Sequence, residues 1–338
     1  MRAFVFLVCS LFLSTASSAA EPGYHVIKQL HLGGDGGWDY LTVDSDARRL
    51  YLSRGTHVMV IDMDTDKIAG DILNTPGVHG IALAPELKRG FISNGKADSA
   101  TIFDITTLKI LGQVKTGANP DAILYDPAVK RVFTFNGRSH DATVFDAMSA
   151  QIVGTITLGG KPEFAVADNR GKIYVNIEDT GEVVEIDSNK LAVTRRFSLK
   201  PCEEPTGMAI DVEHHRIFSG CRSKVMTVLD TGTGKVIAVI PIGEGVDGNG
   251  YDPGTGLAFS SNGDGTLTVA RETAPTRFEV TETIATQRGS RTMAIDSKTH
   301  NIYLPAAEFA PAPPATLEMT KPRPAMIKDS FMVLVVGR

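Results

Sequence analysis

Long runs of helical periodicity are missing from this sequence, and their absence argues against a helical fold. Aromatic residues make up only 7% of the 338 residues, whereas 33 residues are glycine. Such a composition favours many short strands that are joined by turns. Beyond the first twenty residues no stretch is apolar and long enough to span a bilayer, so we expect no membrane span in the mature chain.

An excess of positive charge is also missing. The chain has 34 basic and 39 acidic residues, which gives a formal net charge of −5. An acidic protein does not attract the phosphate backbone of nucleic acids, so a nucleic-acid partner is not expected.

The sequence lacks the short motifs of several enzyme classes. It contains no Gly-x-Ser-x-Gly elbow, no Gly-Lys-Ser/Thr phosphate loop, no His-Glu-x-x-His pair and no Cys-x-x-Cys pair. The glycine-rich run at 33–37 precedes a strand and not a helix, so it lacks an anion-binding geometry. A nucleotide or flavin cofactor and a covalent serine or cysteine mechanism therefore have no support.

The first twenty residues have the features of a signal peptide. A basic start at Arg2 is followed by an apolar segment from 3 to 13 and by small residues up to Ala20. This pattern predicts that residues 1–20 are a signal peptide with cleavage near Ala20, and that the mature protein is periplasmic or secreted. The alternative is an uncleaved anchor.

Two cysteines, Cys202 and Cys221, remain after this cleavage. Export permits a disulfide, and the repeats described next place both cysteines on the same face of one repeat. We therefore predict a Cys202–Cys221 disulfide, with free thiols or metal ligation as the alternatives.

A six-residue pattern recurs along the chain with a period of about forty residues. Each copy is a short apolar run that usually ends in Asp, and further strands follow it. Successive copies are spaced 40, 42, 42, 43, 41 and 44 residues apart. The copies are Asp39–Asp44, His79–Ala84, Asp121–Asp126, Glu163–Asp168, Thr206–Asp211, Asp247–Asp252 and Arg291–Asp296.

Seven copies of a four-stranded unit predict an all-β fold, a seven-bladed β-propeller. The last copy stops after a third strand at Phe331–Val336, so its fourth strand is missing. The segment His25–Leu32 precedes the first copy, and we expect it to complete the last blade and to remove its open edge. Residues 21–338 would then form a single domain. Its Ala- and Pro-rich insertion, 306–330, would be either a lid over the hub or a disordered loop.

The tripeptide Tyr174-Val175-Asn176, the Asp-x-x-Thr-x-Lys turns and the forty-residue period resemble the YVTN-repeat, or YncE-like, propeller family. The resemblance covers nearly all of the mature chain and implies the propeller fold. The family includes proteins of several functions, so the resemblance implies no single activity. The sixth repeat departs from the pattern, because Arg271 stands where the third strand usually ends in Asp.

The first position of each copy should lie at one mouth of the central channel, and together these positions form a ring. The ring residues are Asp39, His79, Asp121, Glu163, Thr206, Asp247 and Arg291. Converging carboxylates raise one another's pKa, and a cation relieves their repulsion. We therefore predict Asp39, Asp121, Glu163 and Asp247 as ligands of a divalent cation such as Ca²⁺, Mg²⁺, Mn²⁺ or Zn²⁺. The alternative is a solvated ring without specific chemistry.

The remaining polar residues near this mouth are candidates for catalysis or ligand binding. His79 would be a metal ligand or general base, and Arg291 would stabilise developing negative charge. The candidates for ligand binding are Trp38, Arg54, His57, Asn94, Asn136, Thr206 and Asn262. Trp38 is alternatively a packed wall residue, and the Asn-Gly pairs are alternatively turn residues.

Two functions fit this ring. The first is a metal-assisted hydrolase, acting on a lactone or ester, or a lyase that removes an acidic proton. The second is a binding or scaffold propeller without catalysis, which holds a small molecule, peptide, glycan or protein partner at the channel mouth. Because a closed propeller is self-sufficient, we expect a monomer.

Overall fold

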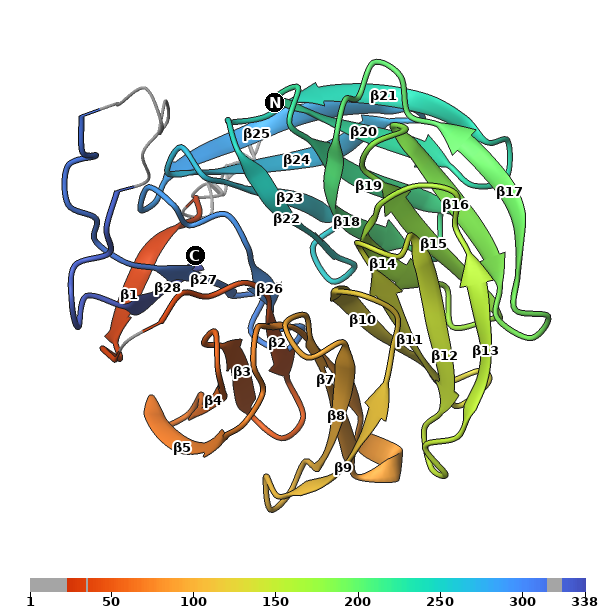
Figure 1. Cartoon of the computed structure of the whole chain (residues 1–338). Helices are drawn as coiled ribbons and strands as arrows, with labels where there is room; N and C mark the ends of the chain where they lie inside the picture. The colour runs from red at the N-terminus through yellow and green to blue at the C-terminus, as the bar shows by residue number, and fades with distance from the viewer. Residues whose placement is uncertain (1–22, 35, 315–323) are drawn as a thin grey trace, which may run out of the picture.

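The computed structural model describes residues 23–34, 36–314 and 324–338 and forms seven four-stranded antiparallel sheets. The sheets stand around a common axis with their first strands innermost (Figure 1). The predicted seven-bladed β-propeller is therefore confirmed. The predicted signal peptide, residues 1–20, lies outside the described residues.

The strands follow the repeats. The innermost strands are β2 (Leu41–Asp44), β6 (Val78–Ala84), β10 (Pro120–Asp126), β14 (Pro162–Ala167), β18 (Pro205–Asp211), β22 (Val246–Asp252) and β26 (Ala294–Ile295). The second strands are β3 (Arg49–Ser53), β7 (Arg89–Asn94), β11 (Arg131–Asn136), β15 (Lys172–Ile177), β19 (Arg216–Cys221), β23 (Leu257–Asn262) and β27 (Ile302–Ala306).

The third strands are β4 (Val58–Asp62), β8 (Ser99–Asp104), β12 (Asp141–Asp146), β16 (Glu182–Asp187), β20 (Val225–Asp230), β24 (Thr266–Ala274) and β28 (Met332–Gly337). The outer strands are β5 (Lys67–Ile72), β9 (Ile110–Lys115), β13 (Ile152–Thr157), β17 (Ala192–Ser198), β21 (Lys235–Pro241), β25 (Arg277–Ala285) and β1 (His25–His31). Within the described residues, the one helical element is a short 3₁₀ helix, η1 (Pro85–Leu87).

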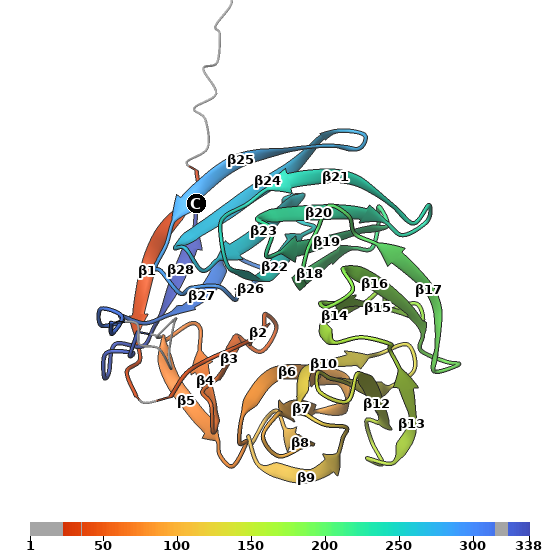
Figure 2. The ribbon, with the colours of Figure 1, turned by 45° about the horizontal axis from the view of Figure 1, so that its top comes forward.

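The N-terminal strand closes the ring of blades. β1 pairs antiparallel with β28, from His25 opposite Gly337 to His31 opposite Met332, and supplies the outer strand of blade seven. This confirms the predicted closure. In Figure 2 the red β1 lies beside the blue β28, so the first and last strands of the structure share one sheet.

Aromatic side chains fill the spaces between neighbouring blades. Phe91 of β7 is fully buried and contacts Tyr125 of β10 and Phe145 of β12, with ring centroids 6.2 and 5.9 Å apart. These contacts join blades two and three in one hydrophobic cluster. Each such buried ring stabilises the fold by about 1.5–3 kcal/mol, which explains the aromatic residue at this point of each repeat.

The Asp that ends most third strands builds the following turn. Asp62 accepts hydrogen bonds from the backbone N–H groups of Asp64 and Thr65 at 3.1 and 2.8 Å, and from the Thr65 hydroxyl at 2.9 Å. These bonds lower the pKa of Asp62. Asp104 and Asp146 make the same bonds in the next two blades. The recurring Asp-x-x-Thr pattern is thus turn chemistry.

Candidate functional site

A break in strand pairing presents the ring residues to the channel mouth. In β10, register passes from Pro120 to Ala122 and skips Asp121. β6, β14, β18 and β22 skip their ring residues in the same way. A bulge of this kind re-aims a side chain. Thr206 is an exception, because its side chain stays buried and donates to the Val246 carbonyl oxygen.

Asp39, His79 and Asp121 converge from blades one, two and three. His79 Nδ1 lies 2.6 Å from Asp39 Oδ2 and 3.2 Å from Asp121 Oδ1. One ligand atom from each residue lies within 4.8 Å of the other two, and all three side chains are half-buried. We name this group the acidic–histidine cluster. Its donor set, one imidazole and two carboxylates, suits a divalent cation.

The two carboxylates hold a proton on His79 more firmly than water would. Burial alone would lower the pKa of His79. The hydrogen bond that His79 donates to Asp39 and the charges of Asp121 and Asp39 outweigh burial and raise that pKa. Burial and the charge of Asp39 likewise raise the pKa of Asp121, against the opposing effect of His79. His79 and the two carboxylates thus form one group that is coupled by a hydrogen bond and by charge.

Asp247 and Arg291 form a second part of the ring. Arg291 Nε donates to Asp247 Oδ2 at 2.6 Å, and its Nη2 lies 4.0 Å from Asp39 Oδ1. Burial and the charge of Asp39 raise the pKa of Asp247 to about 6, although Arg291 opposes the shift. Arg291 thus borders the acidic–histidine cluster and remains partly exposed to the channel mouth.

Glu163 belongs to a third group, with Lys161 and Glu178. Lys161 Nζ donates to Glu163 Oε1 at 2.6 Å and also pairs with Glu178. Arg222 Nη2 lies 3.2 Å from Glu178 Oε1. Burial, the charge of Asp121 and a hydrogen bond with Glu178 raise the pKa of Glu163 to about 9. Glu163 is therefore a neutral acid at neutral pH, and the structure does not bring it into the acidic–histidine cluster.

Two aromatic side chains close the channel beneath the ring. Tyr40 of blade one and Phe164 of blade four meet edge to face with centroids 4.9 Å apart. Together with residues of blades two and three they line a cavity of only about 50 Å³. Burial and the nearby charge of Asp247 raise the pKa of Tyr40 well above its usual value. The contact of these two rings thus spans the channel between blades one and four.

Sequence reasoning missed Lys161, Arg222, Tyr40 and Phe164. The sequence does contain an indication of Tyr40 and Phe164, at the second position of each repeat. Tyr40 and Phe164 are bulky there, whereas the other copies have small residues at this position: Gly80, Ala122, Gly207, Gly248 and Thr292.

Several predicted ligand-binding residues are engaged inside the blades. Asn94, Asn136 and Asn262 are fully buried at the ends of second strands. Each amide donates to a threonine on the third strand of its own blade: Thr101 at 2.8 Å, Thr143 at 3.0 Å and Thr268 at 3.1 Å. The same bond in three blades indicates a structural role, and the structure does not bring these residues into the acidic–histidine cluster.

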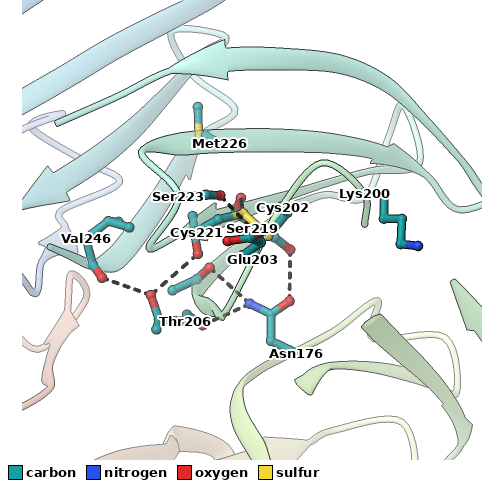
Figure 3. The surroundings of a disulfide bond; sticks show 12 residues. Asn176, Lys200, Cys202, Glu203, Thr206, Ser219, Cys221, Ser223, Met226 and Val246 are labelled. Carbon is teal, nitrogen blue, oxygen red and sulfur yellow. Dashed lines mark hydrogen bonds between the residues drawn. A yellow bond between two sulfur atoms is a disulfide. The ribbon is translucent and has the colours of Figure 1, made fainter. Parts of the chain in front are cut away.

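Thr206 and the predicted disulfide lie together in blade five (Figure 3). Thr206 is buried, and its hydroxyl donates to the Val246 carbonyl oxygen at 2.9 Å. Cys202 and Cys221 form a disulfide with Cα atoms 5.5 Å apart. The bond joins the segment before β18 to the end of β19, and it is compatible with an extracellular or periplasmic location.

Trp38, Arg54 and His57 lie around blade one. Trp38 packs against Phe331 and Phe309, with centroids 5.4 and 6.1 Å apart. The guanidinium of buried Arg54 lies 3.5 Å from the centre of the Phe331 ring. His57 Nε2 lies 3.6 Å from Asp71 of the outer strand β5. The structure does not bring these three residues into the acidic–histidine cluster.

The insertion 306–330 begins close to Trp38. Phe309 forms an isolated bridge with Met326, so the two arms of the insertion run antiparallel at its base. Residues 315–323 lie outside the described residues, and the expected lid function stays a prediction.

Comparison with known proteins identifies the class of fold. A solved structure titled Kuenenia stuttgartiensis hydrazine synthase is similar, with a TM-score of 0.72 over 88% of this chain and 97% of that chain. Its sequence identity is 16%, which shows the fold alone. No family model matches the sequence, and no curated protein matches it. The chain is thus a seven-bladed β-propeller with an acidic–histidine cluster at its hub, and the finer YVTN-repeat resemblance stays a prediction.

No described helix has the length and apolar character needed to cross a membrane.

Proposed function

We propose that the hub binds a divalent cation and that the protein is an exported, metal-assisted hydrolase or lyase acting on a small substrate. The observation that carries this proposal is the acidic–histidine cluster, in which three potential ligand atoms lie within 4.8 Å of one another. Asp39, His79 and Asp121 would hold the cation. Imidazole together with carboxylates favours Mn²⁺ or Zn²⁺ over Ca²⁺ and Mg²⁺.

The electrostatics of the cluster support a cation at this position. His79 Nδ1 faces both carboxylates, and the carboxylates raise the pKa of His79, which supports a positive charge at this position. A divalent cation would supply that charge in place of the proton. When bound, it would contribute Lewis acidity for the polarisation of a carbonyl or the acidification of water.

The neighbouring side chains supply the other requirements of such chemistry. Arg291 can orient an anionic group of the substrate or stabilise negative charge that develops on it. Glu163 can donate a proton to a leaving group at neutral pH, because its pKa is about 9. The Tyr40–Phe164 pair closes the channel from below and limits the water that reaches the ring.

A second candidate function is binding without catalysis. The polar ring residues already have partners: Arg291 pairs with Asp247, Glu163 with Lys161, and His79 with both Asp39 and Asp121. A ring that is neutralised in this way can serve as a polar platform for a peptide or glycan without any ion.

Turnover by the mature protein separates the two functions. We expect hydrolysis of a lactone or ester, or a lyase reaction, that depends on added Mn²⁺ or Zn²⁺. His79→Asn and Asp121→Asn should each reduce it by about 100-fold or more, as loss of a group that stabilises the transition state does. The exposed Glu203 lies outside the ring, so Glu203→Gln is the matched control. Unchanged turnover and cation content in both ring variants would contradict the enzyme proposal and favour the binding platform.

A further inference from the structure

A large cleft lies between blades five and six, at the opposite end of the inner strands from the ring. It has a volume of about 660 Å³, which is within the range of small-molecule sites. One wall is the turn between β18 and β19, and the other is the hairpin of β24 and β25. Figure 2 shows this hairpin reaching outward beside β21 of blade five. We name it the blade-five/six cleft.

Most earlier blade junctions are bridged at the corresponding place by an arginine. Arg49, the first residue of β3, donates to the Ile105 carbonyl oxygen in the outer turn of blade two. Arg89 donates to the Ala147 carbonyl oxygen at 2.8 Å in blade three, and Arg131 donates to that of Ser188 at 3.0 Å in blade four. At the next junction, Arg195 of β17 donates to Thr231 of blade five at 2.9 Å.

The junction between blades five and six departs from this arrangement. Arg216 occupies the equivalent position, but it pairs with Asp230 of its own blade. Its buried Nε has no hydrogen-bond partner within the described part of the chain. The Nη1 of Arg89 and of Arg131 donates to a carbonyl oxygen of the next blade, whereas the Nη1 of Arg216 donates to Asp230.

The sequence of blade six also departs from the other blades at this junction. In blades one to five a basic residue at the start of the second strand faces the Asp that ends the third strand, as Arg216 faces Asp230. In blade six, Leu257 faces Arg271 instead. Without the Asp there is no tight turn, and pairing continues outward to Ala274 opposite Arg277.

The floor of the cleft is aromatic. Phe218 and Tyr251 are nearly parallel, with an interplanar angle of 12° and centroids 5.3 Å apart. Phe278 contacts Phe218 edge to face, with centroids 5.9 Å apart. Tyr251 and Phe278 are only half-buried, so part of each ring is accessible in the cleft.

The rim combines donors and acceptors without a net charge. Arg216 and Arg271 carry two positive charges, and Asp211 and Glu272 carry two negative charges. His214 Nδ1 lies 2.7 Å from Asp211 Oδ2. Such a balance does not select an ion, but it offers hydrogen bonds of both kinds to hydroxyl groups.

We propose that the blade-five/six cleft is a binding site for a neutral carbohydrate. A sugar has apolar ring faces for the aromatic floor, and its hydroxyl groups can exchange hydrogen bonds with the charged side chains of the rim. The cleft volume accommodates one or two sugar units. This site is separate from the hub and does not depend on the function proposed for it.

Saturation-transfer NMR of the full mature protein tests this proposal. The probes are the neutral disaccharides maltose, cellobiose, lactose and diacetylchitobiose, each at millimolar concentration. We expect saturation to be transferred from the protein to at least one of these disaccharides. Arg271→Ala should weaken its binding about fivefold, the effect of one lost hydrogen bond. Thr273→Trp, on the exposed rim, should abolish binding by filling the cleft.

Two matched variants make the outcome decisive. Arg277→Ala removes an exposed arginine of the same hairpin that does not line the cleft, and it should leave binding unchanged. Asp121→Asn alters the hub, and it should also leave sugar binding in the cleft unchanged. The proposal is overturned if no neutral disaccharide receives saturation, or if Arg271→Ala and Thr273→Trp bind as the wild type does. Loss of binding in Asp121→Asn would locate the sugar at the channel mouth and would overturn it as well.

Discussion

Glu163 and Asp247 retain protons that the same side chains would lose in the unfolded chain. The pKa of Glu163 rises from 4.5 to about 9, and that of Asp247 rises from 3.8 to about 6, chiefly because both are buried near other acids. The folded protein therefore binds more protons than the unfolded chain between these values. Linkage requires the free energy of unfolding to fall as pH rises through this interval.

Glu163→Gln should reduce this pH dependence. An amide cannot ionise, so the variant avoids the cost that ionised Glu163 imposes at alkaline pH. We expect the melting temperature of the wild type to fall between pH 6 and pH 9. The melting temperature of the variant should fall less over this interval, and at the alkaline end it should exceed that of the wild type by about 2–4 °C. Thermal denaturation followed by circular dichroism measures both. Glu203→Gln is the exposed control. If the melting temperature changed equally with pH in all three proteins, the raised pKa assigned to Glu163 would be contradicted.

At the scale of structural elements, the disulfide restrains the segment that leads into β18. Cys202 and Cys221 are separated by 19 residues. A loop of this length implies a stabilisation of about 3 kcal/mol through the unfolded state. The restrained segment precedes Thr206, whose hydroxyl bridges blades five and six by its bond to Val246.

Cys202→Ala/Cys221→Ala should therefore lower the free energy of unfolding by about 3 kcal/mol. Urea denaturation under oxidising conditions measures the change. A reductant should lower the stability of the wild type toward that of the variant and should leave the variant unaffected. A loss below about 1 kcal/mol would show that the segment is held by its other contacts.

The strand β1 is the second element with a separable role. It covers β28, whose six residues from Met332 to Gly337 are all buried. Removal of β1 exposes an apolar strand edge, and such edges pair with other chains.

A chain that begins after residue 32 should therefore associate or aggregate. Size-exclusion chromatography with light scattering measures its mass beside that of the mature protein. A synthetic peptide with the sequence 23–32 should restore the mass of the mature protein by pairing with β28. A truncated chain with unchanged mass and melting temperature would contradict the role of β1 in closure.

At the scale of the whole molecule, the repeat period made the fold predictable. Copies every forty residues predicted seven blades, and the missing fourth strand of the last copy predicted that His25–Leu32 would close the ring. Both follow from local sequence, because each blade is built from contiguous strands. The Cys202–Cys221 disulfide was predictable for the same reason, since both residues belong to one repeat.

The arrangement inside the ring was predictable only in part. Alignment placed Asp39, His79 and Asp121 at one mouth, but it did not show that Glu163 pairs with Lys161. The contact of Tyr40 with Phe164 crosses the channel between blades one and four, so no local pattern contains it. The departure at Arg271 was visible in the sequence, but the cleft also depends on the orientation of Arg216.

The central claim is that the acidic–histidine cluster binds a cation, and calorimetric titration of the mature protein with Mn²⁺ and Zn²⁺ tests it most directly. We predict one cation per chain, and no binding by Asp39→Asn/Asp121→Asn. Affinity should decrease as pH falls through the raised pKa of His79, because the cation must displace the proton on Nδ1. Glu203→Gln should bind as the wild type does. Absence of binding in the wild type, or equal binding in the double variant, would contradict the claim and identify the ring as a charge-paired platform.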